Sequence, residues 1–287
     1  MKIAVASGKG GTGKTMVATS LAASLAPYFS VAFLDCDVEE PNSKYFLKPK
    51  FDQFESAVIR IPVIDEKKCT LCGKCVQVCE FHALAKIMDK IIPYPQLCHG
   101  CGSCSYNCPE KAIHEQPREI GKISIGQTSS GIDFRMGELI VSEPMPTPII
   151  RQLKAYSSQP HEVTILDSPP GSSCSVVSTV YDADYVILVT EPTPFGLHDL
   201  KQMTGILSKT KTPAGVIINR DGIGDQGVEN YLKNQPYPIL VKIPFQKLIA
   251  ARLAAGELLI DFMPEYLSTF LELFEKIKSQ VPFVGQL

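Results

Sequence analysis

A glycine-rich segment near the N-terminus carries residues suited to binding nucleotide phosphates. Residues 8–15 read G-K-G-G-T-G-K-T and fit the phosphate-loop pattern G-x-x-x-x-G-K-[ST]. Glycines let backbone N–H groups turn toward phosphate oxygens, and the N-terminus of a following helix adds partial positive charge. Lys14 is expected to reach the β- and γ-phosphates, and Thr15 to bind Mg²⁺, so the sequence predicts a site for ATP with Mg²⁺. The predicted nucleotide-binding residues in this loop are Gly8, Gly10, Gly11, Thr12, Gly13, Lys14 and Thr15.

A second chemical feature is the crowding of eight of the ten cysteines into positions 69–108. In a chain without a visible secretion signal, such crowding indicates metal binding rather than disulfides. The cysteines form two runs of the pattern C-x₂-C-x₂-C-x₃-C, and Gly73 recurs in the second run as Gly102. We therefore interpret the segment as an internal duplication. The two runs are Cys69, Cys72, Cys75 and Cys79, and Cys98, Cys101, Cys104 and Cys108.

Each run resembles the cysteine run of the bacterial ferredoxins. In two-cluster ferredoxins, three closely spaced cysteines bind one cluster and the fourth serves the other cluster. The resemblance implies two [4Fe–4S] clusters. The alternative is a pair of zinc sites, although zinc motifs usually show two C-x₂-C pairs separated by roughly a dozen residues or more. The implied ligand sets are Cys69, Cys72, Cys75 and Cys108 for one cluster, and Cys79, Cys98, Cys101 and Cys104 for the other.

Short, continuously apolar segments are expected to position the phosphate loop. The first of them, residues 3–6, ends just before the loop, and a helix is expected from about 15 to 25. Continuous apolar runs suit parallel strands that are covered on both faces. Further runs of this kind are 31–35, 163–167, 185–190, 215–219 and 239–243. Helical segments alternate with them near 149–156, 196–209, 225–234, 246–257 and 264–279. The alternation predicts an α/β fold, with a doubly wound, mostly parallel sheet and helices on both faces.

This pattern changes between about residues 61 and 117, where cysteines replace apolar periodicity. We interpret residues 61–117 as a small inserted α+β ferredoxin-like domain. Residues 1–60 and 118–287 then form a discontinuous phosphate-loop ATPase domain. Within the second part, residues 122–125 and 138–141 are expected to form a β-pair that returns the chain to the main sheet.

Three segments resemble the deviant-Walker ATPases, the family of MinD, ParA, the Mrp-type cluster carriers and the nitrogenase iron protein. They are Lys9 beside Gly8, the Asp-Cys-Asp sequence at 35–37, and the Leu-Asp-Ser-Pro-Pro-Gly sequence at 166–171. The resemblance covers about 1–45 and 160–260. In that family the early lysine reaches across a dimer that sandwiches the nucleotides. Lys9 therefore implies an ATP-dependent homodimer, and the alternative is a solvated surface lysine.

The same resemblance implies roles for further residues. Asp37 would position the attacking water, and Asp35 would be a support near Mg²⁺. Asp167 would hold Mg²⁺ through its water shell, and Gly171 in the second switch would sense the γ-phosphate. Asn219 would read adenine, although an asparagine at a strand end is often only a turn residue. The catalytic candidates are thus Lys9, Lys14 and Asp37, and the Mg²⁺ candidates are Thr15, Asp35 and Asp167.

Two cysteines lie outside the runs. Cys36 is expected to be a small packed side chain. Cys174 follows Gly171 in the second switch, which faces the dimer partner in this family. The nitrogenase iron protein places a cluster-binding cysteine in that switch, so Cys174 is a candidate contact to a metal cluster or redox partner. The alternative is a buried free thiol.

Composition limits the choice of partners. Lys and Arg number 28 and Asp and Glu 30, a net charge of −2 without the clustered basic excess of nucleic-acid-binding domains. No apolar run reaches the roughly 18–20 residues that span a bilayer, and no signal sequence is visible. Residues 264–279 mix acidic and basic side chains, unlike a basic membrane-binding helix. We expect a cytoplasmic protein that binds neither nucleic acid nor membrane.

The leading hypothesis is an ATP-binding and ATP-hydrolysing dimeric switch that carries two [4Fe–4S] clusters. Its nucleotide state would be coupled to electron transfer, or to iron–sulfur or metal-cluster assembly, through an unidentified redox or cluster-accepting protein. The alternative is a MinD/ParA-like positioning ATPase in which the clusters are structural. A third reading, a ferredoxin with a vestigial nucleotide domain, is disfavoured by the intact set of Lys14, Thr15, Asp37 and Asp167.

Overall fold

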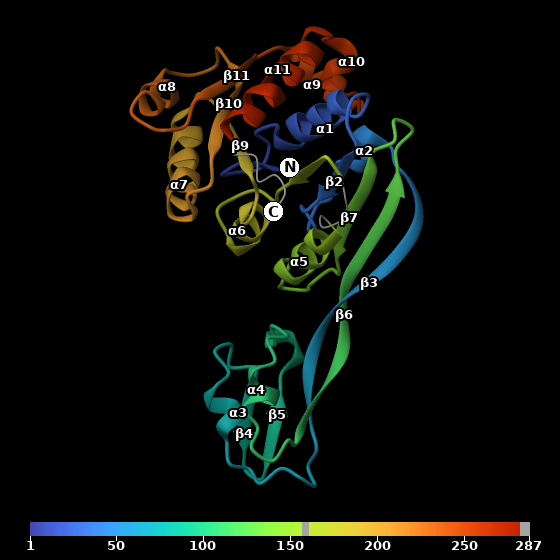
Figure 1. Cartoon of the computed structure of the whole chain (residues 1–287). Helices are drawn as coiled ribbons and strands as arrows, with labels where there is room; N and C mark the ends of the chain where they lie inside the picture. Colours follow the sequence, from blue (N-terminus) through green and yellow to red (C-terminus); the bar gives the residue numbers. More distant parts are fainter. Residues whose placement is uncertain (157–160, 282–287) are drawn as a thin grey trace.

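The computed structural model describes residues 1–156 and 161–281. Within this part of the chain, one nine-stranded sheet forms the centre of the molecule (Figure 1). Its strands are β1 (Lys2–Ala6), β2 (Val31–Asp35), β3 (Lys50–Ile64), β6 (Ile113–Gln127), β7 (Asp133–Leu139), β8 (Val163–Asp167), β9 (Tyr185–Thr190), β10 (Ala214–Asp221) and β11 (Ile239–Pro244). They are ordered β11-β10-β9-β1-β8-β2-β7-β6-β3.

The sheet is parallel from β11 to β7, and only the edge strands β6 and β3 run antiparallel to their neighbours. Every residue of β2, β8 and β9 is buried, as continuous apolar sequence requires of strands covered on both faces. The predicted α/β fold with a mostly parallel sheet is therefore confirmed.

Helices cover both faces of the sheet, which separates the core into two layers. Ile3 and Val5 of β1 pack toward one layer, and Ala4 and Ala6 pack toward the other, because successive strand residues point to opposite faces. The first layer holds α1 (Lys14–Leu25), α2 (Lys44–Leu47), α9 (Lys247–Ala254), α10 (Leu259–Phe262) and α11 (Glu265–Gln280). The second holds α5 (Thr147–Ala155), α6 (Cys174–Val180), α7 (Pro194–Thr210) and α8 (Gly227–Leu232).

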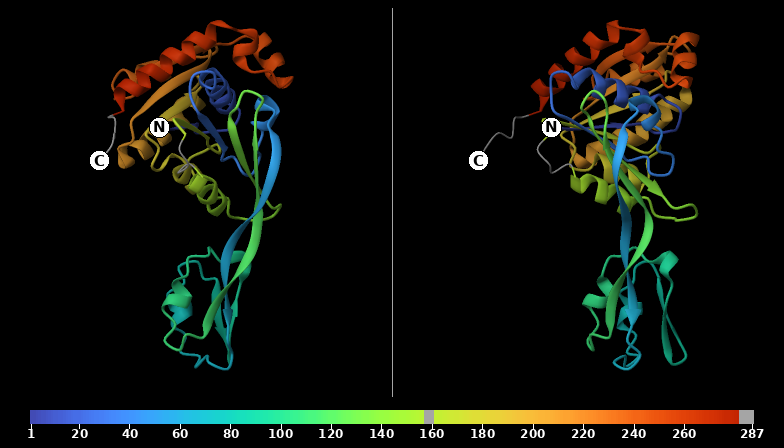
Figure 2. Two further views of the ribbon diagram at one scale, coloured as in Figure 1. Left: turned by 45° about the vertical axis from the view of Figure 1, so that its right-hand side comes forward. Right: turned by 90° about the vertical axis from the view of Figure 1, so that its right-hand side faces the viewer.

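The edge strands β3 and β6 continue beyond the sheet as a long antiparallel ribbon (Figures 1 and 2). Their pairing runs from Lys50 opposite Gln127 to Ile64 opposite Ile113, whereas β7 pairs only with the Gly121–Gln127 part of β6. Both predicted domain boundaries, 61 and 117, thus fall inside these two strands.

The returning β-pair was predicted correctly in kind but not in extent. Lys122 does lie opposite Glu138, yet β7 spans Asp133–Leu139 rather than 138–141. Its length follows from parallel pairing with β2, which uses β7 residues Asp133 to Met136. The apolar Ile140 and Val141 lie past the strand end and are 47% and 91% exposed.

At the far end of the ribbon lies a small body formed by residues 65–112, called here the cysteine unit (Figure 2). It contains one hairpin, β4 (Leu84–Ile87) with β5 (Lys90–Pro93), and the short helices α3 (Lys74–Gln77), η1 (Pro95–Leu97) and α4 (Ser103–Tyr106). Gly73 and Gly102 precede α3 and α4 with φ of 77° and 74°, a left-handed conformation suited to glycine. The sequence duplication is therefore also a duplication of local structure. In the described residues, no helix combines the length and apolar character needed to cross a membrane.

Candidate functional site

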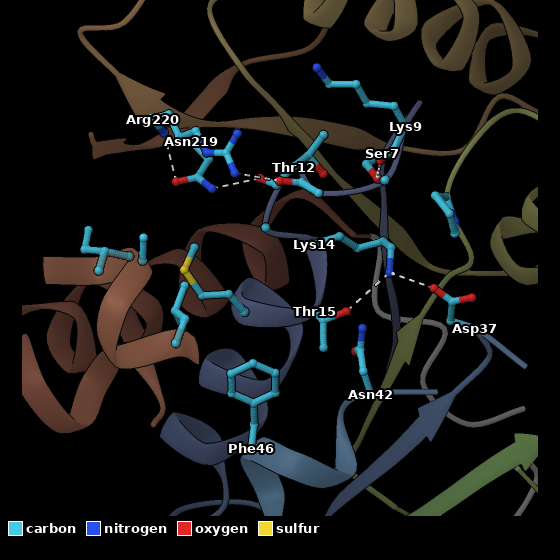
Figure 3. Close-up of a pocket in the computed structure, with 18 of the residues that line it drawn as sticks. Ser7, Lys9, Thr12, Lys14, Thr15, Asp37, Asn42, Phe46, Asn219 and Arg220 are labelled. Atoms are coloured by element: carbon cyan, nitrogen blue, oxygen red, sulfur yellow. Dashed lines mark hydrogen bonds and ion pairs between the residues drawn. The ribbon is translucent and has the colours of Figure 1, made fainter. Parts of the chain in front are cut away.

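The phosphate loop joins β1 to α1 at the carboxyl edge of the parallel strands. Gly11 and Gly13 adopt φ of 76° and 93°, so the loop turns where only glycine does so without strain. A Cβ atom added to Gly13 would lie 2.3 Å from Nδ2 of Asn219, whereas one on Gly10 would meet open space. Beside the loop lies a cavity of about 310 Å³ that is lined by all of the predicted loop residues except Gly8 (Figure 3). A cavity of this size suits a small organic ligand.

Lys14 is the buried cation of this cavity. Its Nζ lies 3.8 Å from Oδ2 of Asp37 and 3.4 Å from Oγ1 of Thr15 (Figure 3). It also lies 2.9 Å from Oδ1 of Asp167. Burial alone would lower the pKa of Lys14, but the charges of Asp167, Asp37 and Asp35 outweigh it, and the pKa is raised. Lys14 is therefore charged at neutral pH.

Asp167, at the end of β8, has one carboxylate oxygen that accepts no hydrogen bond from the described residues. Its side chain is fully buried, and Oδ1 accepts from Lys14, but Oδ2 has no hydrogen-bond partner among the described residues. A buried carboxylate oxygen without a donor is costly unless a cation or water contacts it. Thr12 Oγ1 is buried in the same unpartnered way. The predicted Mg²⁺ candidates Asp167 and Thr15 thus come together around Lys14.

Asp35, in contrast, accepts hydrogen bonds from protein groups at both of its carboxylate oxygens. Oδ1 accepts from the backbone N–H of Asp37 at 3.2 Å, and Oδ2 accepts from both the N–H and the hydroxyl of Ser43. Burial, with the nearby charge of Asp167, raises the pKa of Asp35. Asp35 therefore orders the segment after β2, while its predicted role near Mg²⁺ stays a prediction. Asp37 keeps its carboxylate toward Lys14, and burial raises its pKa to about 6 although Lys14 opposes the shift.

Lys9 and Asn219 lie on the other side of the loop. The Lys9 side chain extends away from Lys14 (Figure 3). Its Nζ lies 3.1 Å from Oε2 of Glu191. Asn219 Nδ2 donates to the carbonyl oxygen of Thr12 at 2.8 Å, and its Oδ1 accepts from the Arg220 N–H. Asn219 thus holds the loop itself, and a contact to adenine remains a prediction.

Two kinds of site residue were missed in the sequence. Glu191 directly follows β9, just as Asp35 and Asp167 end β2 and β8, and this shared position was the available signal. The apolar side of the cavity had no comparable signal, because folding alone brings its residues to the loop. That side includes Phe46, Phe245, Ile249, Ala250 and Leu253.

The segment that follows β8, which is the predicted second switch, lies next to the phosphate loop. The Gly171 N–H donates to the Ser7 carbonyl at 3.0 Å, and Gly171 has φ of 97°. Cys174, the first residue of α6, is exposed, so the alternative of a buried thiol is wrong. Cys174 therefore lies on the surface, three residues after Gly171. Cys36 is buried as expected, and burial raises the pKa of its thiol.

A family model described as the CobQ/CobB/MinD/ParA nucleotide binding domain matches residues 3–260. The chain belongs to this family.

The chain is also similar in sequence to two archaeal proteins and in fold to a solved structure. The uncharacterized protein MJ0578 of Methanocaldococcus jannaschii is 34% identical over 279 residues, which cover 97% of this chain and 96% of that protein. The uncharacterized protein MJ0579 of the same organism is 33% identical over 265 residues, covering 91% and 92%. The septum site-determining protein MinD of Pyrococcus horikoshii, solved with Mg-ADP, has the same fold, with a TM-score of 0.62 at 18% identity and coverage of 100% and 99%.

In this member of the CobQ/CobB/MinD/ParA family, the eight clustered cysteines line two small cavities of the cysteine unit. The sequence-predicted sets are brought together, with the fourth residue of each run exchanged. The first cavity is lined by Cys69, Cys72, Cys75 and Cys108, and the second by Cys79, Cys98, Cys101 and Cys104. In residues 1–156 and 161–281, no three or more His, Cys, Asp or Glu side chains are grouped closely enough for a single metal ion.

The exchanged cysteines share a further feature. The Ala83 N–H donates to Cys79 Sγ at 3.2 Å, and the Ala112 N–H donates to Cys108 Sγ at 3.3 Å. The surroundings of the two cavities differ, since isoleucines line the first and Arg60, His99 and Glu115 reach the second.

Proposed function

We propose that the protein binds ATP with Mg²⁺ and hydrolyses it, as a nucleotide-dependent switch of the MinD/ParA kind. The observation that carries this proposal is the placement of Lys14 inside the phosphate loop, between the carboxylates of Asp167 and Asp37. A phosphate that enters the loop competes with these carboxylates for the same ammonium group. Nucleotide binding therefore changes the charge balance at the ends of β2 and β8, which begin the two switches.

The site residues have different proposed roles, which follow from the chemistry of their side chains and backbone groups. Thr15 Oγ1 and the unpartnered Oδ2 of Asp167 are hard oxygen donors of the kind Mg²⁺ prefers, and the ion neutralises charge on the phosphates. Asp37 orients the attacking water. The Gly171 N–H, which bonds to Ser7, exchanges that partner for the γ-phosphate. The solved MinD relative carries Mg-ADP, which supports the same ligand class for this chain.

The proposed active form is a homodimer that sandwiches two nucleotides. Lys9 supports it, because a lysine at this position of the loop has no evident use toward its own nucleotide while its side chain points away from Lys14 (Figure 3). In the dimer, Lys9 contacts the nucleotide of the other subunit.

We propose that the cysteine unit binds two [4Fe–4S] clusters and that it belongs to an inserted domain of about residues 61–117. Each cavity gathers four sulfur donors, which are soft ligands that suit iron–sulfur clusters. The four sulfurs of each cavity would hold one cluster. Such clusters supply one-electron chemistry or structural cross-links.

Two uses of these clusters are compatible with the cavities. The family and the fold likeness favour a positioning ATPase in which the clusters are structural, since the solved structures with this fold include MinD proteins. A second candidate is coupling to electron transfer or metal-cluster assembly with an acceptor protein, and the pair of neighbouring four-cysteine cavities favours it. Either use implies a reducing compartment such as the cytoplasm.

Anaerobic purification separates these possibilities. ATP hydrolysis that is lost in Lys14→Ala while the iron content stays unchanged supports the ATPase assignment and the independence of the two sites. Iron and sulfide contents near eight atoms of each per chain support two clusters, as two [4Fe–4S] groups require.

Electron paramagnetic resonance spectra distinguish the two uses of the clusters. Spectra that change when ATP is added support coupling. Spectra that do not respond to ATP, together with a loss of protein stability when iron is removed, support the structural use. Protein without iron after anaerobic reconstitution refutes the cluster proposal but not the ATPase.

A further inference from the structure

Glu191 is a buried carboxylate for which the proposed nucleotide roles give no use. Its side chain is only 6% exposed, and it follows β9 at the edge of the sheet that carries the phosphate loop. Oε2 accepts from Lys9 Nζ at 3.1 Å, and Oε1 lies 2.6 Å from Nη1 of Arg220. Each carboxylate oxygen therefore serves one cation.

Arg220 ties this pair to the phosphate loop. Its Nη2 donates to the Gly11 carbonyl at 3.0 Å, so one guanidinium spans Glu191 and the loop. The Arg220 backbone has φ of 55°, an uncommon conformation for a side-chain-bearing residue, and the neighbouring Asn219 amide bonds its N–H. Arg220 is thus held by Glu191, by the Gly11 carbonyl and by Asn219. Lys9 has one acidic partner in the described residues, which is Glu191.

We propose that Glu191 is a positioning residue that holds Lys9 within its own subunit until the nucleotide of a second subunit competes for it. This inference rests on the proposed sandwich dimer. Lys9 is 33% exposed at the side chain and carries a single mobile ammonium group, so it is able to leave. Arg220 then still neutralises Glu191, which avoids an isolated buried charge.

If Lys9 leaves Glu191 to contact the nucleotide of the other subunit, each subunit loses its Lys9–Glu191 ion pair when the dimer forms. Glu191→Gln tests this because its amide oxygen still accepts from Arg220 while its NH₂ group no longer holds the Lys9 ammonium. We expect the dissociation constant of the dimer, measured by analytical ultracentrifugation with AMPPNP and Mg²⁺, to fall about fivefold, the size of a partly exposed ion pair. In a chain that already carries Lys9→Ala, Glu191→Gln should leave the dissociation constant of the dimer unchanged. A purely structural effect of Glu191 would not depend on whether Lys9 is present.

Matched variants keep the test sharp. Glu229→Gln removes the 2.6 Å ion pair to Lys242, which lies outside the cavity lining, and leaves the dimer affinity unchanged. If Glu191→Gln does not fold, Glu191→Asp carries the test, because it keeps the charge but withdraws it by one methylene from both cations. A wild-type chain that forms no dimer with any nucleotide overturns the proposed function and this inference with it. A wild-type dimer whose affinity is unchanged in Glu191→Gln, or a gain that persists without Lys9, overturns the inference alone.

Discussion

The side-chain amide of Asn219 donates to the Thr12 carbonyl at 2.8 Å, directly across the place where a side chain on Gly13 would stand. This contact fixes the last turn of the phosphate loop to the end of β10. The loop therefore has a defined shape that depends on a residue about two hundred positions away, and that dependence is open to a stability test.

Gly13→Ala is expected to destabilise the fold as well as the loop. The new Cβ would lie 2.3 Å from Asn219 Nδ2, and the residue would retain φ of 93°. We expect the free energy of unfolding, measured by urea titration, to fall by about 2 kcal/mol. Gly10→Ala is the control, since its Cβ meets no atom within 4 Å, and it should stay within about 0.5 kcal/mol of wild type. Equal losses in both variants would contradict the packing described at Gly13.

Asp37→Asn should stabilise the protein at neutral pH when Mg²⁺ and nucleotide are removed with EDTA and dialysis. Burial raises the pKa of Asp37 to about 6, so the ionised carboxylate costs folding free energy above that pH. The cost disappears as the pH falls from about 6 toward the unfolded value near 4, because the folded state then binds the proton. We expect a gain of about 1 kcal/mol at pH 7 and none near pH 4, with loss of ATP hydrolysis. A constant gain at both pH values would show that ionisation is not its source.

Crossed cysteine ligation is testable with double variants. Cys79 lies in the first run but lines the cavity of the second, so Cys79→Ala with Cys101→Ala damages one cavity only. Cys79→Ala with Cys75→Ala damages both cavities. Iron analysis after anaerobic reconstitution should give about half of the wild-type iron for the first pair and almost none for the second. Ligation within each run would give the reverse order.

Thiol labelling distinguishes the two cysteines outside the runs. Cys174 is exposed, whereas Cys36 is buried and burial raises the pKa of its thiol, which lowers its reactivity. In iron-loaded protein, iodoacetamide at pH 8 should therefore label Cys174 quickly and Cys36 only after denaturation, as read by peptide mass spectrometry. Cys174→Ser should abolish the fast label. Fast labelling of Cys72 or Cys101 in the iron-loaded protein would argue against cluster ligation, because both are exposed.

The sequence was most informative where chemistry and burial coincide. Strands β2, β8 and β9 were located to the residue because a parallel strand buried on both faces is apolar throughout. The long strand β3 was not predicted, since many of its residues are exposed and its apolar pattern is broken. Glu191 was overlooked because a single acid after a strand has no motif, although it directly follows β9 and Asp35 similarly stands at the end of β2. The apolar cavity lining depends on α9 packing near the loop, which local sequence does not report.

The β3–β6 ribbon is a long arm between the sheet and the cysteine unit. Each strand has 15 residues, or about 50 Å of extended chain, and the pairing continues without a loop from the sheet edge to the cysteine unit. A register shift between Ala57 and Val58 is the one irregularity along the arm beyond its first residues. A rotation at the edge of the sheet, where β6 pairs with β7, would therefore displace the cysteine unit by more than it displaces the edge itself, as in any long arm. The nucleotide cavity and the two cysteine cavities thus lie in separate parts of the molecule that are connected through β2, β7 and the ribbon.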